Sequence, residues 1–133
     1  MDFLLDTNIC IYIIKNQPIS VIEKFRSISI GNIGISSITL AELQYGVMKS
    51  SNQEKNQNAL NNFLVPLEII GFDYFASVEY GKIRAILEKK GTPIGPLDML
   101  IGAHAISLGI TLVTNNHKEF NKIEGIKIEN WVK

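Results

Sequence analysis

The sequence predicts an α/β protein with a central, mostly parallel sheet of four or five strands that is covered by helices on both faces. Short apolar segments alternate along the chain with longer segments whose apolar residues have helical spacing. Strands that alternate with helices are typical of a parallel sheet buried between two helical layers. With 133 residues and neither repeats nor a low-complexity linker, the chain fits one domain over residues 1–133.

Capping and turn residues place the individual elements. Asp6-Thr7-Asn8 supplies N-cap chemistry to the first helix, and Thr39 and Glu42 have the spacing of a capping box. Gly91 and Gly109 each follow a helical segment in the C-terminal half and are expected to end it. The expected elements are a strand at 3–5, helices at 7–16 and 19–29, a strand at 33–36, helices at 38–50 and 53–65, a strand at 67–70, helices at 73–90 and 96–108, and strands at 110–113 and 126–128.

The C-terminal half carries the clearest signals. Segment 73–90 is a long amphipathic pattern, and the connector 92–96 is held extended by its prolines. Segment 96–108 is apolar almost all round, so its helix is expected to be buried between layers. Segment 110–113 is rich in β-branched residues and predicts a central strand, whereas 126–128 is expected at the edge.

Charge and cysteine content exclude several classes of protein. The 13 basic and 13 acidic residues cancel, so nucleic-acid contacts require a local basic cluster. Cys10 is the only cysteine, which rules out an internal disulfide, and it is expected to be a small core residue. The start has no export signal and no run has transmembrane character, so a cytoplasmic location is expected. The best basic cluster, which the solvated face of helix 73–90 explains equally well, consists of Lys82, Arg84, Lys89 and Lys90.

Three carboxylates stand alone in stretches that contain no other formal charge: Asp6, Glu42 and Asp98. A carboxylate that is removed from water without a cation costs several kcal/mol or is neutralised. A bound divalent metal would supply the missing positive charge and would explain why acids are kept in apolar surroundings. Because the flanking residues are largely apolar, the sequence predicts a metal site.

The predicted topology brings these acids to one edge of the sheet. Asp6 directly follows the first strand, and Glu42 lies in the first turn of the helix that leaves the second strand. Asp98 opens a helix that must run antiparallel to strand 110–113, so it also begins at the carboxyl edge, where such sheets bind ligands. The segment after that strand adds the oxygen ligands Thr114, Asn116 and Glu119.

Each acid also has a purely structural interpretation. Asp6 would serve only as an N-cap, Glu42 only as the capping-box partner of Thr39, and Asp98 only as an acid favoured by the helix dipole. These interpretations explain the acids one at a time. They do not explain why three isolated acids are assigned to the same edge.

The motifs around these residues resemble PIN-domain endoribonucleases and, within them, VapC-type toxins of bacterial toxin/antitoxin pairs. The resemblance covers essentially the whole chain and implies the PIN fold, an α/β/α sandwich. Its marks, in order, are Leu5-Asp6-Thr7-Asn8, Ser37-Ile38-Thr39-Leu40-Ala41-Glu42-Leu43, Ile94-Gly95-Pro96-Leu97-Asp98, and Leu112-Val113-Thr114-Asn115-Asn116 leading to Glu119-Phe120.

The resemblance implies that Asp6, Glu42 and Asp98 bind Mg²⁺ or Mn²⁺, which would activate a water for phosphodiester hydrolysis. Many PIN domains carry an Asp soon after the last central strand, but this chain has Asn116 and then Glu119. The fourth ligand is therefore left open between these two residues, and so is the number of ions. Asn116 is also assigned to the catalytic set.

The resemblance further implies RNA as the substrate, with structured RNA such as tRNA as the expected target and inhibition of translation as the outcome. The residues assigned to substrate contacts or to orienting the site are Thr7, Asn8, Thr114, Glu119 and Arg84. His104 is expected to be a core or interface residue, and His117 is expected to be exposed.

Family resemblance also implies partners. A VapB-like antitoxin would occupy an apolar groove, and both a homodimer and a toxin/antitoxin hetero-oligomer are expected. The first helix carries more apolar surface than one face needs, which fits such a groove as well as it fits full burial in the core. Its apolar residues are Ile9, Ile11, Tyr12 and Ile13.

Other α/β classes fit the sequence less well. A phosphatase or receiver domain with Asp6 as phosphoryl acceptor would need a second acid where Asn8 stands and a lysine directly after strand 110–113. The glycine-rich phosphate-binding motifs of nucleotide-binding folds are absent. A catalytically inactive PIN-like module that only binds RNA or protein remains an open alternative.

Overall fold

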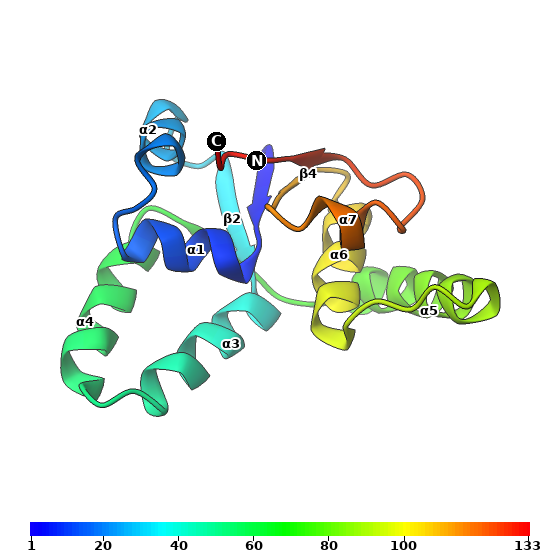
Figure 1. The fold of residues 1–133 in the computed structure, drawn as a ribbon, viewed down its shortest axis with the longest axis horizontal. Helices are drawn as coiled ribbons and strands as arrows, with labels where there is room; N and C mark the ends of the chain where they lie inside the picture. Colours follow the sequence, from blue (N-terminus) through cyan, green and yellow to red (C-terminus); the bar gives the residue numbers. More distant parts are fainter.

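The computed structural model describes residues 1–133 and contains a five-stranded sheet between two layers of helices (Figure 1). The strand order is β3-β2-β1-β4-β5, and every neighbouring pair is parallel. The predicted α/β class and parallel sheet are thereby confirmed. The strands are β1 (Phe3–Leu5), β2 (Ile33–Ser36), β3 (Glu68–Ile70), β4 (Thr111–Val113) and β5 (Ile128–Glu129).

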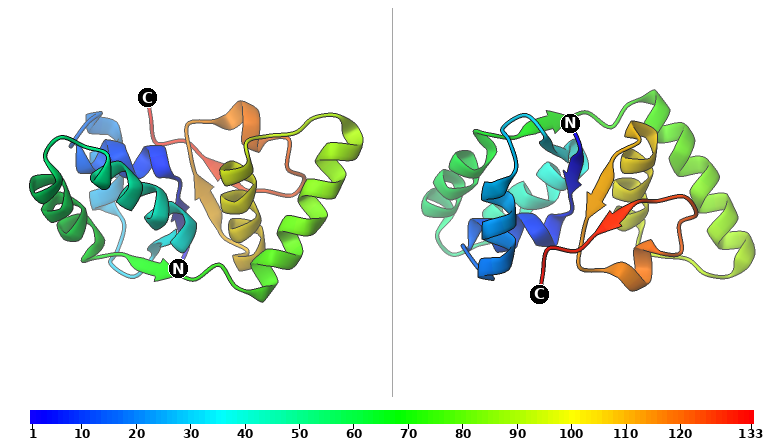
Figure 2. Two further views of the ribbon diagram at one scale, coloured as in Figure 1. Left: turned by 90° about the horizontal axis from the view of Figure 1, so that it is seen from below. Right: turned by 90° about the horizontal axis from the view of Figure 1, so that it is seen from above.

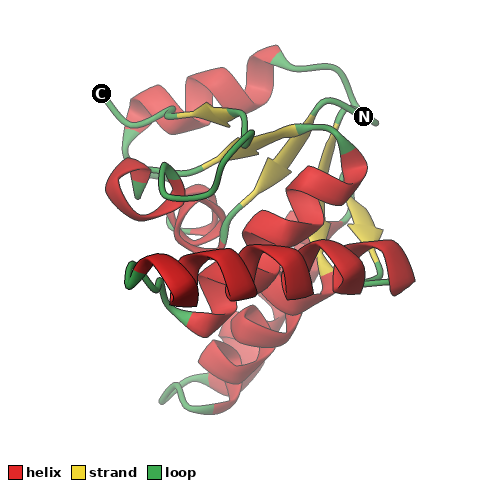
Figure 3. Ribbon diagram, turned by 90° about the vertical axis from the view of Figure 1, so that its right-hand side faces the viewer, coloured by secondary structure: helices red, strands yellow, loops and turns green.

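The seven helices divide into two groups, one on each face of the sheet. Figure 1 shows α1 to α4 on one side of the strands and α5 to α7 on the other, and Figure 2 shows the same separation from above and below. From the side in Figure 3, the long helix α5 lies in front of the sheet. The helices are α1 (Thr7–Ile14), α2 (Ile19–Ser27), α3 (Ser37–Met48), α4 (Gln53–Leu64), α5 (Tyr74–Lys90), α6 (Pro96–Leu108) and α7 (His117–Phe120).

Each face of the sheet has its own apolar core because successive side chains of a strand point to opposite faces. Leu5 and Val113 pack with α1 to α4, whereas Leu4 and Leu112 pack with α5 to α7. All four side chains are fully buried. Cys10 is also buried in the first core, as expected. No helix combines the length and apolar character that are needed to span a bilayer.

Most predicted boundaries agree with the structure to within two residues. Gly91 and Gly109 end α5 and α6 with φ values of +70° and +67°, a left-handed conformation that glycine adopts without strain. The edge strand begins at Ile128, so the expectation of 126–128 was wrong by two residues. The short helix α7 was not predicted, because four residues are too few to show a periodicity.

The predicted capping box at Thr39 and Glu42 is wrong. The cap is Ser36, whose Oγ accepts a hydrogen bond from the Ile38 N–H at 3.1 Å, so α3 begins at Ser37. Since a serine directly at the end of β2 can cap the helix, no later cap is needed. Glu42 consequently lies in the second turn of α3 and not in the first, and the interpretation of Glu42 as a capping residue is excluded.

Candidate active site

Asp6 and Thr114 lie where the strand order reverses. β1 is paired on one side with β2 and on the other with β4, so β1 and β4 form the switch point of the sheet. The crevice beyond the carboxyl ends of strands at such a point is the usual ligand site of parallel α/β sheets. Asp6 follows β1, Thr114 follows β4, and both residues are buried. The Asp6 N–H donates to the Val113 carbonyl at 3.0 Å, which holds the two strand ends together.

The Asp6 carboxylate is 5% exposed and caps α1, because its Oδ1 accepts a hydrogen bond from the Ile9 N–H at 2.9 Å. Burial raises the pKa of Asp6 to about 6, against the opposing effect of hydrogen bonds from Thr114 and Ile9. The negative charges of Asp98 and Glu42 raise the pKa further. The capping interpretation is therefore correct but incomplete, since it does not account for two more acids close enough to affect Asp6.

Glu42 and Asp98 reach the same region from two different helices. The Glu42 Oε1 accepts a hydrogen bond from the Thr7 Oγ1 at 2.7 Å, which links α3 to the start of α1. Asp98 is the third residue of α6, and its pKa is raised by partial burial and by the charges of Glu42 and Glu119. The structure thus brings together the three acids that stand isolated in the sequence.

The two candidates for the fourth metal ligand, Asn116 and Glu119, have different surroundings. The Asn116 Nδ2 donates to the Asp98 Oδ2 at 3.5 Å, and the Asn116 N–H donates to the Thr114 Oγ1 at 2.9 Å. Glu119 lies in α7 and forms an ion pair with Lys122, with 3.2 Å between the charged atoms. Asn116 therefore contacts the acid cluster directly, whereas Glu119 is paired with Lys122 and affects Asp98 through its charge, which raises the Asp98 pKa.

A hydrated Mg²⁺ or Mn²⁺ ion fits this set of residues. None of the three acids forms an ion pair, since the ion pairs of the structure use other carboxylates. The nearby donors are hard oxygen atoms, which these ions prefer. No group of three or more His, Cys, Asp or Glu side chains forms a ready-made metal cage. Mg²⁺ does not need one, because it keeps several waters and binds through one or two carboxylates.

An open groove of about 640 Å³ lies beside Glu42, between α1 and α3. The half-buried Thr7 and the exposed Asn8 line it together with Glu42, so both predicted substrate-contacting residues of α1 border the site. Two further residues line the same groove that no sequence motif singled out, Tyr45 and Lys49. They follow Glu42 by about one and two helical turns, and this spacing, which is visible in the sequence, could have identified them.

The apolar residues of the first helix are divided between core and surface. Ile9 is fully buried, whereas Ile11, Tyr12 and Ile13 are only partly buried. Ile11 lines the groove beside Glu42 and also a second cavity of about 280 Å³ that Glu42 lines too. Part of this helix is therefore core and part of it forms an apolar groove wall.

Neither histidine reaches the acid cluster. His104 is buried in α6 and its Nδ1 lies 2.8 Å from the Ser36 Oγ, which confirms that it is a core residue. Burial lowers its pKa. His117 is exposed at the start of α7, as expected.

The basic cluster lies on the exposed surface of α5. Lys82 pairs with Glu79 at 3.7 Å, and Arg84 pairs with Glu88 at 2.9 Å. Two of the four cations are therefore already partnered by acids of the same helix, as expected for a solvated helix face. Lys89 and Lys90 form no ion pair and lie in the last turn of α5, six residues or more before the start of α6.

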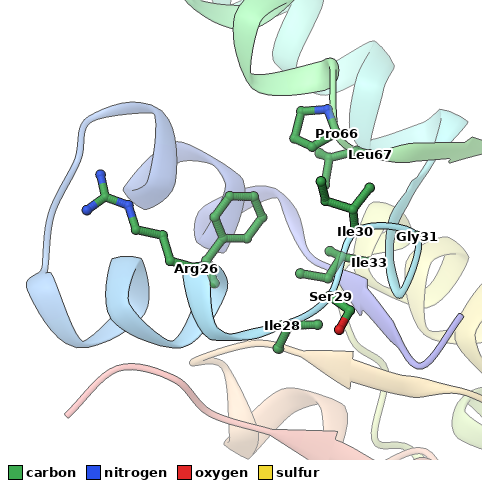
Figure 4. A pocket seen from close by; sticks show the side chains of 9 residues that line it. Arg26, Ile28, Ser29, Ile30, Gly31, Ile33, Pro66 and Leu67 are labelled. Atoms are coloured by element: carbon green, nitrogen blue, oxygen red, sulfur yellow. The ribbon is translucent and has the colours of Figure 1, made fainter.

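A separate cavity of about 160 Å³ lies at the opposite end of the sheet, before β2 and β3 (Figure 4). It is lined mainly by apolar side chains such as Ile33 and Leu67, and the guanidinium of Arg26 points away from them. The cavity contains no carboxylate. The acidic site and this cavity are therefore distinct features at opposite edges of the sheet.

Comparison with known proteins agrees with this geometry. The family model of the PIN domain matches residues 3–126. The tRNA(fMet)-specific endonuclease VapC of Salmonella typhimurium is 47% identical over 131 residues, which cover 98% of each chain. Ribonuclease VapC2 of Rickettsia felis is 50% identical over 134 residues and all of both chains.

Solved structures give the same result. The toxin chain that matches in the crystal structure of VapBC2 from Rickettsia felis, bound to a DNA fragment from its promoter, has a TM-score of 0.93 and 49% identity. The alignment covers 99% of this chain and 100% of that one. For DNA-bound VapBC from Salmonella typhimurium, the TM-score is 0.94 and the identity 46%, with 99% of each chain covered.

The chain therefore belongs to the PIN-domain family, as the fold and the acids at the switch point indicate. Within that family it is of the VapC type, which confirms the resemblance seen in its motifs.

Proposed function

We propose that the chain is a metal-dependent endoribonuclease that acts as the toxin of a toxin/antitoxin pair. The observation that carries this proposal is the meeting of Asp6, Glu42 and Asp98 at the switch point without any basic partner. Relatives of nearly equal length are named endonuclease or ribonuclease, which supports the same class of reaction.

In this mechanism the carboxylates of Asp6, Glu42 and Asp98 would hold a hydrated Mg²⁺ ion, or Mn²⁺ as a substitute, with one or two of them as direct ligands. When bound, the ion would activate a water and neutralise charge on the phosphate. The chain fixes the carboxylates before the ion arrives: Ile9 and Thr114 hold Asp6, Thr7 holds Glu42, and Asn116 contacts Asp98. Such positioning by neighbouring hydrogen bonds is typical of metal ligands.

Initiator tRNA is the substrate that the relatives favour, because the Salmonella typhimurium protein is named as tRNA(fMet)-specific. Cleavage of this tRNA would inhibit translation and growth, and the reaction would take place in the cytoplasm. Thr7 and Asn8 border the acids, and together with Glu119 and Arg84 they are the chain's proposed contacts to the RNA.

A VapB-type antitoxin is the proposed protein partner. The matching crystal structures from Rickettsia felis and Salmonella typhimurium are VapBC complexes. The partly exposed apolar residues of α1, with the cavity of about 280 Å³ between α1, α3 and α4, offer an antitoxin a binding surface next to Glu42. A homodimer that assembles with the antitoxin into a hetero-oligomer is proposed as well.

The test is cleavage of a tRNA(fMet) transcript with Mg²⁺, with Mn²⁺ and with EDTA. Asp6→Asn and Asp98→Asn should each lower the cleavage rate by at least about 100-fold, because each removes a charge from the metal site. Glu54→Gln, an exposed acid on α4, is the matched control and should cleave normally. Circular dichroism and thermal unfolding establish that each variant is folded.

Two results would contradict the proposal. Cleavage that persists in EDTA, or that survives both Asp→Asn substitutions, would reject the metal mechanism. RNA binding without cleavage under all metal conditions would instead identify a catalytically inactive RNA-binding module.

A further inference from the structure

The groove beside Glu42 extends along α3 beyond this residue. Tyr45 lies one turn and Lys49 two turns after Glu42, and both line the same groove of about 640 Å³. This volume falls within the roughly 300–1,000 Å³ of small-ligand sites. Asn8 and Thr7 line the other side, on α1. The groove therefore joins the proposed metal site to an aromatic ring and a cation.

Tyr45 is 66% exposed, so its ring is open to a ligand. The Lys49 Nζ lies 5.1 Å from the centre of this ring, which is the geometry of a cation–π contact. Lys49 forms no ion pair with a carboxylate. It is thus a positive charge without an acidic partner, on a groove whose one acid, Glu42, would otherwise repel a phosphate.

An aromatic ring, a free cation and a metal-binding edge in one groove match the chemistry of single-stranded RNA. Bases that are not paired stack on exposed aromatic side chains, and basic side chains meet the backbone phosphates. Exposed aromatic residues are common on protein surfaces and need no function. Tyr74 and Phe75 on α5 are such a case, since they contact each other and no cation lies over them.

We propose that Tyr45 and Lys49 form a nucleotide subsite of the RNA groove. An unpaired base next to the scissile phosphate stacks on the face of the Tyr45 ring that Lys49 does not cover, and Lys49 binds the phosphate of that nucleotide. The proposal rests on the proposed ribonuclease function for the identity of the ligand as RNA. It predicts that the chain holds its substrate through a single-stranded segment, because a base inside a duplex cannot stack on the ring.

The experiment measures equilibrium binding of a tRNA(fMet) transcript and of a mixed-sequence single-stranded RNA 10-mer. Binding is measured on the Asp98→Asn background so that the RNA stays intact. The test variants are Tyr45→Phe, Tyr45→Ala and Lys49→Ala. The matched controls are Tyr74→Ala, which removes a ring that is 75% exposed on α5, and Lys55→Ala, which removes an exposed unpaired cation on α4.

Tyr45→Ala should weaken binding of both RNAs by about 5- to 150-fold, the range for loss of one stacked base. Tyr45→Phe keeps the ring and should bind within about twofold of the parent. Lys49→Ala should reduce the slope of log K against log salt concentration by about 0.7 to 1, since one phosphate contact is lost. Tyr74→Ala and Lys55→Ala should leave affinity and slope unchanged.

Several results would overturn the subsite. They are unchanged RNA binding by Tyr45→Ala, an equal loss in Tyr45→Phe and Tyr45→Ala, or an equal loss in the Tyr74→Ala control. If Tyr45→Ala binds RNA normally but no longer binds a VapB-type antitoxin, the ring belongs to a protein interface, which would also overturn the proposal. A cleavage assay on the protein with native Asp98 distinguishes failure of the subsite from failure of the ribonuclease function. Metal-dependent cleavage that is insensitive to Tyr45→Ala rejects the subsite alone. Absence of cleavage rejects the ribonuclease function.

Discussion

Asp6 combines two tasks that oppose each other energetically. As an N-cap, its carboxylate stabilises α1, yet its burial near Asp98 and Glu42 penalises the charged form and raises its pKa to about 6. An acid at this position therefore lowers the stability of the metal-free protein near neutral pH. A bound cation would remove this penalty, which is the physical link between the fold and the metal.

The stability of the metal-free protein should fall as the pH rises from about 4 to about 6. The folded-state pKa of Asp6 lies above its ordinary value of 3.8, so the folded protein holds this proton longer than the unfolded chain. The loss approaches about 3 kcal/mol above pH 6, at about 1.4 kcal/mol per pKa unit. Asp6→Asn keeps a capping side chain but loses the charge, so it should flatten this pH dependence.

Thermal unfolding in EDTA at pH 4.5 and pH 7.5 measures the effect, and a repeat at pH 7.5 with Mg²⁺ measures the role of the ion. The native protein should gain stability from Mg²⁺ and Asp6→Asn should gain far less. The same pH dependence in the native protein and in Asp6→Asn would show that Asp6 is not the group responsible.

Ser36 connects three elements of the fold. It ends β2, caps α3 through the Ile38 N–H, and lies 2.8 Å from His104 Nδ1 on α6. A hydroxyl can accept the N–H and donate its proton to a neutral histidine at the same time. This contact links the start of α3, which carries Glu42, to α6, which carries Asp98.

Ser36→Ala should lower the free energy of unfolding by about 2 kcal/mol, since it removes a helix cap and leaves a buried histidine nitrogen unpaired. Asn52→Ala is the matched control. It also removes a cap, that of α4, but at an exposed position, so it should cost about 1 kcal/mol. Urea unfolding of the three proteins gives the comparison. An equal cost in both variants would mean that the His104 contact adds nothing to the cap.

Across the molecule, positive charge is scattered and the proposed active site is negative. The net charge is zero, and the acids at the switch point would repel RNA unless cations nearby offset them. Arg84 is the predicted phosphate contact on α5, although Glu88 and the Tyr80 hydroxyl already engage its guanidinium. These partners leave guanidinium donors free, so a phosphate can still bind.

Arg84→Ala should weaken binding of the tRNA(fMet) transcript. It should also reduce the slope of log K against log salt concentration by about 1, the value expected for the loss of one phosphate contact. Arg26→Ala is the control of equal charge, because Arg26 is exposed beside the cavity at the opposite edge of the sheet. Binding is measured across a series of salt concentrations. If Arg84→Ala and Arg26→Ala have the same slope as the native protein, Arg84 does not contact RNA and belongs to the solvated face of α5.

Local chemistry in the chain was enough to identify most of the elements and the three acids. Strand and helix periodicities are local, and so are the turns at Gly91 and Gly109, which explains why boundaries agree closely. The isolation of Asp6, Glu42 and Asp98 among uncharged residues is also visible without coordinates. The parallel order of the strands then follows from their alternation with helices.

Contacts between distant segments had to come from the folded molecule. Ser36 rather than Thr39 caps α3, His104 meets a residue 68 positions away, and Tyr45 shares a groove with Thr7 and Asn8. Sequence spacing along one helix tells which residues share a face, but not which other helix that face will meet. The packing of α1, α3 and α6 around one sheet edge makes that choice, because burying the apolar faces of these helices there also brings their caps and the three acids to the same place.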